Sequence, residues 1–152
     1  ATALVAVEAP RLVEVFGPKL LAEAASTLAA RCLLSGFVGF LADEPLLALW
    51  EELLEARSAG YKRFPLIAWL AGLVCYVEGD LAALGQNSEP EELVPLFFRR
   101  VQEAGLSLPD GWRPSVKVSA DRIEELRCLS EEAALGYMRS YEEQQQREVH
   151  AK

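Results

Sequence analysis

The sequence predicts an all-α fold, a single-domain bundle of five to seven helices around a central apolar helix at about residues 65–84. Two nearly uninterrupted apolar runs, residues 32–42 and 65–77, lie within a chain that is otherwise acidic. Around them, apolar side chains recur at spacings of three and four, which is the period of an amphipathic helix. A helix that is apolar on all sides is normally surrounded by others, so we place the second run at the centre.

Proline and glycine mark the ends of the first helices. Pro10 is suited to begin a short helix, because its missing N–H and fixed φ fit the first turn, and Gly17 is suited to end it. Pro18 opens a long helix that we expect to reach about Ala42. Polar side chains recur every four residues along this helix and mark its solvent side: Lys19, Glu23, Thr27, Arg31 and Ser35.

The next helix, from Pro45 to about Ser58, has two faces. We expect its inner, apolar face to consist of Leu46, Leu49, Trp50, Leu53 and Leu54. The outer face carries three glutamates, Glu51, Glu52 and Glu55. Carboxylate metal sites of helical bundles also use an inward-facing Glu-x-x-His pair, which these residues lack, so we expect a solvated acidic face and no metal. Before this helix, Gly36 and Gly39 indicate the close approach of a neighbouring helix.

The elements beyond the central helix are shorter. Ser88 is a candidate N-cap for a helix that runs to about Ala104. Residues 106–119 are predicted to be irregular, with an alternation at 116–118 that is typical of a single short strand. A further short helix begins at Asp121.

A last helix is predicted after Ser130, and we assign residues 1–152 to a single helical domain, since a chain of this length builds one core. Residues 142–147 offer no apolar position. A polar helix without packing is marginal in water, so we expect residues 142–152 to form a polar tail that projects or frays.

The acidic charge of the chain argues against nucleic acid as a partner. The 152 residues carry a net charge of −8, and their 25% of charged residues is typical of a folded domain. Clustered lysine and arginine are absent, so nucleic acid is excluded as a partner.

Three separated cysteines in or near apolar stretches are typical of a reduced, cytoplasmic protein. The run 65–77 reaches only about 20 Å, against about 30 Å of bilayer, so no transmembrane segment is expected.

The residue types needed for catalysis are scarce. His150, the only histidine, lies on the polar tail, where nothing would orient it as a base or ligand. Glu78 and Asp80 follow Tyr76 at the end of the apolar helix, where a carboxylate beside the core could act in acid–base chemistry. The simpler interpretation is that they mark the point where the helix enters solvent. We assign no catalytic residue and no cofactor.

Two hypotheses for function remain. We favour a non-enzymatic protein-interaction module, an adaptor, chaperone-like subunit or immunity-type inhibitor, that presents the acidic face of Glu51, Glu52 and Glu55 to a protein partner or forms a homo-oligomer. The alternative is a small-molecule-binding protein or enzyme with an apolar pocket between helices. That pocket would be lined by Phe37, Phe40, Trp69, Tyr76, Glu78 and Asp80 and would take a small apolar ligand.

Overall fold

The computed structural model describes residues 2–58 and 64–128, and this part of the chain contains seven helices and no strand. The predicted all-α bundle of five to seven helices is confirmed. The chain divides into two compact units, Ala1–Ala120 and Asp121–Lys152. Most of the second unit, including the predicted last helix and the polar tail 142–152, lies outside the described residues. The assignment of residues 1–152 to one domain therefore stays a prediction.

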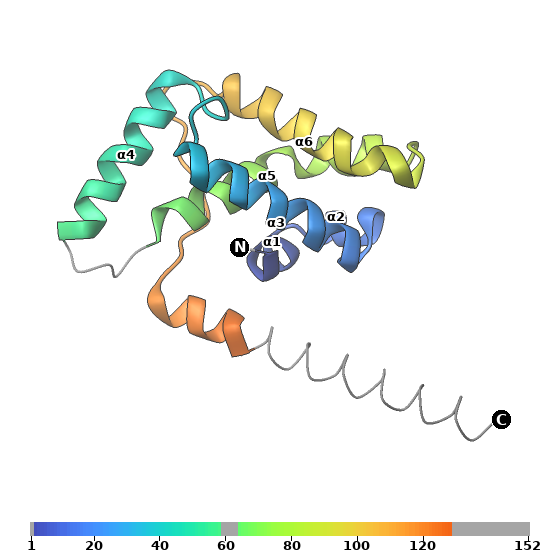
Figure 1. Ribbon diagram of the computed structural model, residues 1–152, viewed down its shortest axis with the longest axis horizontal. Helices are drawn as coiled ribbons and strands as arrows, with labels where there is room; N and C mark the ends of the chain where they lie inside the picture. The colour runs from blue at the N-terminus through green and yellow to red at the C-terminus, as the bar shows by residue number, and fades with distance from the viewer. Residues whose placement is uncertain (1, 59–63, 129–152) are drawn as a thin grey trace. The chain divides into compact units, whose positions relative to one another are not determined.

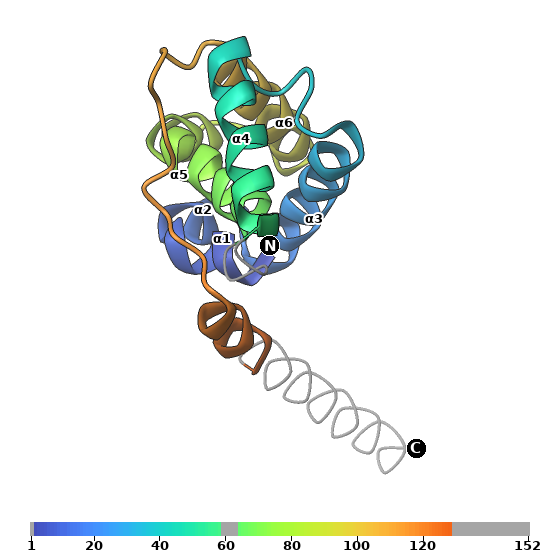
Figure 2. The ribbon, with the colours of Figure 1, turned by 90° about the vertical axis from the view of Figure 1, so that its left-hand side faces the viewer.

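Six helices belong to the first unit, and the central one is the helix that was predicted to be central. Helix α5 contacts each of the other five helices of this unit (Figures 1 and 2). Its side chains Trp69 and Leu73 are completely buried. The helices are α1 (Thr2–Glu8), α2 (Pro10–Phe16), α3 (Pro18–Ser35), α4 (Asp43–Ser58), α5 (Pro65–Gly85) and α6 (Pro90–Leu106). A short helix at residues 120–128 follows.

Helix α5 has 21 residues and is long and apolar enough to cross a membrane by length and composition alone. The length used above is that of the apolar run 65–77, and the helix continues for eight residues beyond Val77 to Gly85, so the absence of a transmembrane segment stays a prediction. Half of its most apolar stretch is buried inside the structure.

Helix α1 is a feature that the sequence pattern did not predict. It has seven residues and no acidic side chain in its first turn. Its stability comes from packing, since Leu4 and Val5 are buried and the helix contacts α2, α3 and α5.

Helix α3 ends at Ser35, so the prediction that it reaches Ala42 was wrong. Gly36 is left-handed, with a φ of 59°. The next residue, Phe37, has a φ of 66° and its N–H donates to the carbonyl of Cys32 at 2.9 Å. This hydrogen bond belongs to a Schellman motif, which ends a helix and satisfies its last carbonyls. Gly36 thus serves to reverse the chain, and not, as predicted, to admit a neighbouring helix.

The turn that follows α3 packs against the end of α6. The N–H of Ala42 donates to the carbonyl of Gly105 at 2.9 Å. A Cβ atom at Gly105 would collide with the carbonyl oxygen of Phe40. Gly105, and not Gly36 or Gly39, is therefore the glycine that permits a close backbone approach in this part of the fold.

Two details around α6 differ from the prediction. Ser88 does not cap the helix, because its hydroxyl donates back to the carbonyl of Leu84 at 2.9 Å, and α6 begins at Pro90. Residues 116–118 form no strand, although the N–H of Phe64 donates to the carbonyl of Val118 at 3.3 Å. The irregular character of the segment between α6 and residue 120 is confirmed.

Candidate functional site

Of the three glutamates predicted to face a partner, two are exposed and one is not. Glu51 and Glu55 are exposed on α4, whereas Glu52 is half-buried. The indole N–H of Trp69 donates to Oε2 of Glu52 at 3.1 Å, and the Trp69 ring is completely buried. The placement of Glu52 on the outer face was therefore wrong: its carboxylate satisfies a buried donor and joins α4 to α5.

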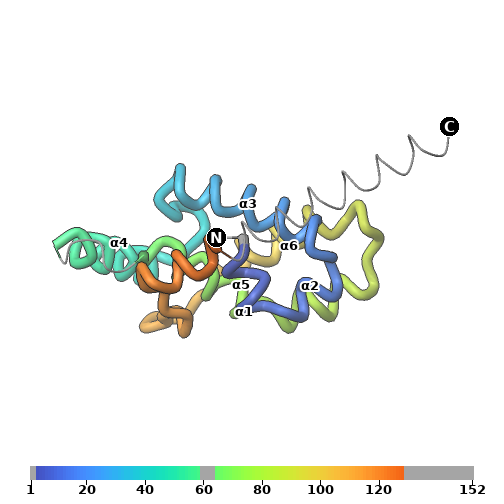
Figure 3. The backbone as a smooth tube through the Cα atoms, turned by 90° about the horizontal axis from the view of Figure 1, so that it is seen from below, coloured from blue at the N-terminus to red at the C-terminus, as the bar shows by residue number. Residues whose placement is uncertain are grey.

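The apolar face of α4 also differs from the prediction. Leu49 is buried as expected, but Trp50 and Leu54 are exposed by 42% and 68%. Among the described helices, α5 is the one on which α4 packs extensively, and α4 projects beyond the other helices of its unit (Figure 3). One neighbour covers only a narrow strip of a helix. That strip consists of Pro45, Ala48, Leu49 and Ala56.

Three large apolar side chains on the free side of α4 form a row along the helix. Leu47, Trp50 and Leu54 are spaced by three and four residues, so they lie on one face of the helix. Leu47 is 58% exposed. We call these three residues the α4 stripe.

The end of α3 adds further exposed apolar side chains. Leu34 is 90% exposed, and Leu33 and Val38 are about half exposed. The indole N–H of Trp50 donates to the carbonyl of Gly36 at 3.1 Å, which ties the α4 stripe to the end of α3. Together with the α4 stripe, Leu33, Leu34 and Val38 form what we call the α3–α4 apolar surface. Sequence reasoning missed Leu33, Leu34 and Leu47, because their helical spacing is the same as that of buried leucines.

Acidic side chains lie beside the α4 stripe. Glu51 follows Trp50 and Glu55 follows Leu54, so the two carboxylates form a row next to the two apolar side chains. Within the described part of the chain, neither glutamate forms an ion pair. Asp43 lies one turn before Leu47 and is also exposed. The basic residue of α4, Arg57, comes at its C-terminal end, where it complements the helix dipole.

Glu44, at the start of α4, is engaged within the fold. Its Oε1 accepts from the guanidinium of Arg113 at 3.0 Å, and its Oε2 accepts from the N–H of Gly111 at 2.9 Å. These hydrogen bonds lower the pKa of Glu44 below its ordinary value. The contacts join the irregular segment after α6 to α4, so Glu44 has a structural role.

The residues of the predicted pocket do not gather around one space. Trp69 and Tyr76 are joined by a third aromatic residue, Trp112, which meets both edge-on with ring centroids 5.4 Å and 5.8 Å away. Trp112 comes from the irregular segment after α6, and it occupies the place beside Trp69 where a ligand was expected. Pro114 of the same segment lies so close to Gly72 that a Cβ atom there would meet it.

The other predicted pocket residues make separate contacts. Oε1 of Glu78 accepts from the backbone N–H of Arg11 at the start of α2, at 2.9 Å. Asp80 pairs with Arg100 of α6 at 3.2 Å. Phe37 is completely buried and Phe40 is half-buried, both in the turn after α3. Each carboxylate therefore holds a neighbouring helix.

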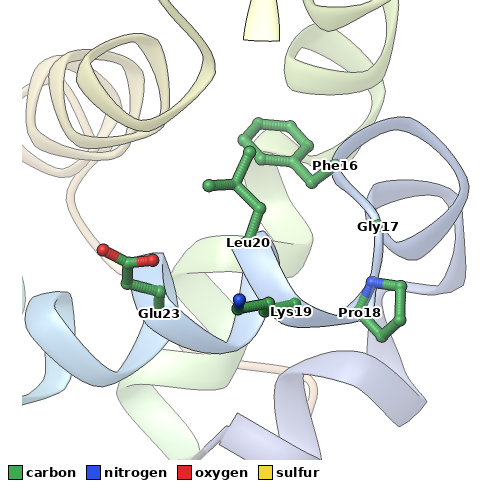
Figure 4. A pocket seen from close by; sticks show the side chains of 6 residues that line it. All are labelled: Phe16, Gly17, Pro18, Lys19, Leu20 and Glu23. Atoms are coloured by element: carbon green, nitrogen blue, oxygen red, sulfur yellow. The ribbon is translucent and has the colours of Figure 1, made fainter. Parts of the chain in front are cut away.

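Two open hollows on the first unit are lined by other residues. One, of about 410 Å³, lies at the α2–α3 junction, where the side chain of Leu20 stands beside the Phe16 ring and Lys19 and Glu23 are at the rim (Figure 4). The second, of about 320 Å³, lies between α2 and α5 around Gly79. Neither brings together a set of groups with a recognisable chemistry.

The two cysteines of the first unit and the described carboxylates give no further candidate. Burial raises the pKa of the Cys32 thiol to about 12. Burial, with the nearby charges of Glu78 and Glu8, raises the pKa of Cys75 to about 11, and its thiol contacts the carbonyl of Glu8. Both thiols are thus protonated and unreactive at neutral pH. Among the described residues, no three His, Cys, Asp or Glu side chains are placed to hold a metal ion.

No protein-family model, no curated protein and no solved structure matches this chain. The fold and its surface define an all-α bundle with one projecting helix, whose free side carries exposed apolar side chains next to carboxylates that form no ion pair with a described residue.

Proposed function

We propose that this protein is a non-enzymatic, cytoplasmic protein-interaction module that binds a protein partner through the α3–α4 apolar surface. The observation that carries the proposal is the exposure of six large apolar side chains at the end of α3 and on one side of α4. Contiguous exposed apolar side chains bordered by polar residues are typical of protein interfaces.

The stability of the fold does not explain these side chains. Helix α4 is held to α5 by Leu49, by small residues and by the hydrogen bond between Trp69 and Glu52. The α4 stripe lies on the opposite side, where apolar groups remain in water and gain little from folding. A partner that covered them would remove this area from water, and Trp50, as an indole, is among the residues that most often dominate binding energy.

A photocrosslinking experiment tests the proposal. Benzoylphenylalanine is introduced into the full chain at Leu54 or, as a matched control, at Leu84, an exposed leucine of α5. The chain is irradiated in its native cells and adducts are identified by mass spectrometry. We expect a protein adduct at position 54 that is absent at position 84. The identified protein, once purified, should bind the wild type and lose affinity with Leu54→Ser but not with Leu84→Ser.

Absence of a specific adduct at position 54 would contradict the proposal. The same conclusion would follow from a purified partner that binds Leu54→Ser as tightly as the wild type. Leu47→Ser gives a second, independent variant on the same stripe. The thermal midpoint of each variant, followed by circular dichroism, shows that a loss of binding is not a loss of folding.

A further inference from the structure

We propose that the occupant of the α3–α4 apolar surface is an amphipathic helix of a partner protein, with a row of lysine or arginine beside its apolar side, lying along α4. This inference rests on the function proposed above and specifies the partner.

The spacing of the α4 stripe fits the side of another helix. The intervals of three and four residues between Leu47, Trp50 and Leu54 are those of the a and d positions of a heptad. Side chains at this spacing interdigitate with the same pattern on a neighbouring helix that crosses at a small angle. Helix α4 has 16 residues and therefore offers a length of about 24 Å. Within the described part of the chain, α5 is the helix that packs extensively on α4, and the α4 stripe on the opposite side is exposed.

The charge beside the stripe selects a basic partner. Glu51 and Glu55 border Trp50 and Leu54, and neither has a cation within ion-pair distance in the described part of the chain. Arg113 interacts electrostatically with Glu51, but its guanidinium is paired with Glu44. An approaching helix with lysine or arginine beside its apolar row would form ion pairs with these carboxylates, whereas an acidic helix would be repelled by them.

The same charges oppose a second copy of this chain as the occupant. In a two-fold interface the same patch meets itself, so the carboxylate rows of two α4 helices would come close to each other. The net charge of −8 adds a general repulsion between copies. An anionic membrane surface is disfavoured for the same reason.

The test uses the full chain and a fluorescein-labelled helical peptide of about 18 residues, long enough to form helix on binding. Leucine occupies its a and d positions, lysine its e and g positions, and alanine the rest. Two control peptides carry glutamate in place of lysine, or glutamine in place of leucine. Binding is measured by fluorescence anisotropy at about 0.1 M and about 1 M salt, between which the Debye length falls from about 10 Å to about 3 Å.

We expect the leucine–lysine peptide to bind and both control peptides to bind at least about tenfold more weakly. Leu54→Ser should weaken binding at least about tenfold at both salt concentrations, because it removes buried apolar contact. Glu51→Gln with Glu55→Gln should weaken it about three- to tenfold at low salt and hardly at high salt. The matched control, Glu14→Gln with Glu23→Gln, makes the same change of charge on α2 and α3 and should leave binding unchanged.

Several results would overturn the inference. If the glutamate peptide bound as tightly as the leucine–lysine peptide, the surface would not select a basic partner. If Leu54→Ser did not change the affinity, the peptide would bind elsewhere on the protein. A dimer in light scattering that Leu54→Ser converts to a monomer would assign the surface to a second copy. Binding to phosphatidylcholine vesicles that Leu54→Ser abolishes, without peptide binding, would assign it to a membrane.

The two proposals can fail separately. If the protein crosslinked at position 54 binds through Leu54 but contacts it with a strand, a loop or an acidic helix, the helix inference fails and the interaction module stands. If no protein adduct forms at position 54 and the leucine–lysine peptide does not bind, the proposed function itself fails.

Discussion

Replacing Leu73 by alanine tests whether α5 is the structural centre of the fold. Leu73 is completely buried on a helix that contacts five others, so its removed side-chain atoms leave a cavity that the packed surroundings refill only in part. Loss of a buried leucine side chain costs about 2 to 5 kcal/mol. A domain of this size loses about 2 to 4 °C of thermal midpoint per kcal/mol, so the midpoint should fall by about 4 to 20 °C.

The matched control is Leu54→Ala, which removes the same atoms from a side chain that is 68% exposed. It should change the free energy of unfolding by less than about 0.5 kcal/mol. Urea unfolding followed by circular dichroism gives both values, and equal m-values would show that the two variants unfold in the same way. A loss below about 1 kcal/mol at Leu73, or equal losses at the two positions, would refute the central placement of α5.

Three further changes test the contacts that join the helices. Gly105→Ala should lower the free energy of unfolding by about 1 to 3 kcal/mol because a backbone carbonyl fills the space of the new Cβ, whereas Gly79→Ala, with open space and a helical backbone, should raise it by up to about 1 kcal/mol; thermal melts compare the two. Because Arg113 lowers the pKa of Glu44, its carboxylate stabilises the fold above its unfolded pKa and loses this effect as the pH falls through the folded pKa. The midpoint difference between wild type and Glu44→Gln should thus be largest near neutral pH and vanish in acid, and a constant difference would contradict the cause given. Glu52→Ala should cost about 1 to 3 kcal/mol in urea unfolding, because it leaves a buried indole N–H without an acceptor, and a loss near zero would contradict that role.

The helix starts were predictable because their signals are local. Pro10, Pro18 and Pro65 each stand in the first turn of a helix, where the missing N–H has no cost. Gly17 ends α2 with a φ of 75°, a conformation that glycine adopts without strain. These residues act on the backbone within one turn, so they indicate helix ends without knowledge of the tertiary fold.

The end of α3 could not be predicted in the same way. A glycine inside a helix costs only about 1 kcal/mol, so Gly36 is compatible with a continued helix and with a stop. The deciding factor is tertiary: Phe37 becomes completely buried when the chain reverses at Gly36. Helix α1 was missed for a related reason, because its short sequence has no cap signal and is held by the burial of Leu4 and Val5.

The candidate site was predictable only in part. Periodicity showed that α4 is amphipathic and placed Glu51 and Glu55 in solvent, as observed. It could not tell which apolar positions would be covered, because leucines extend around almost half of the helix, which is more than one neighbouring helix covers. That choice depends on the number of neighbouring helices, which the sequence of α4 does not contain. One neighbour leaves Trp50 and Leu54 outside.

The two sides of α4 have separable roles, and this separation makes the proposed function testable. The side that faces α5 uses Leu49, small residues and the Glu52 carboxylate, so it contributes to stability. The free side carries Leu47, Trp50 and Leu54, whose exposed area contributes little to folding. A substitution on the free side should therefore change association and leave unfolding unaltered, and a substitution at Glu52 should do the reverse. If the leucines on the free side served only the fold, no substitution there could change association without also changing the free energy of unfolding.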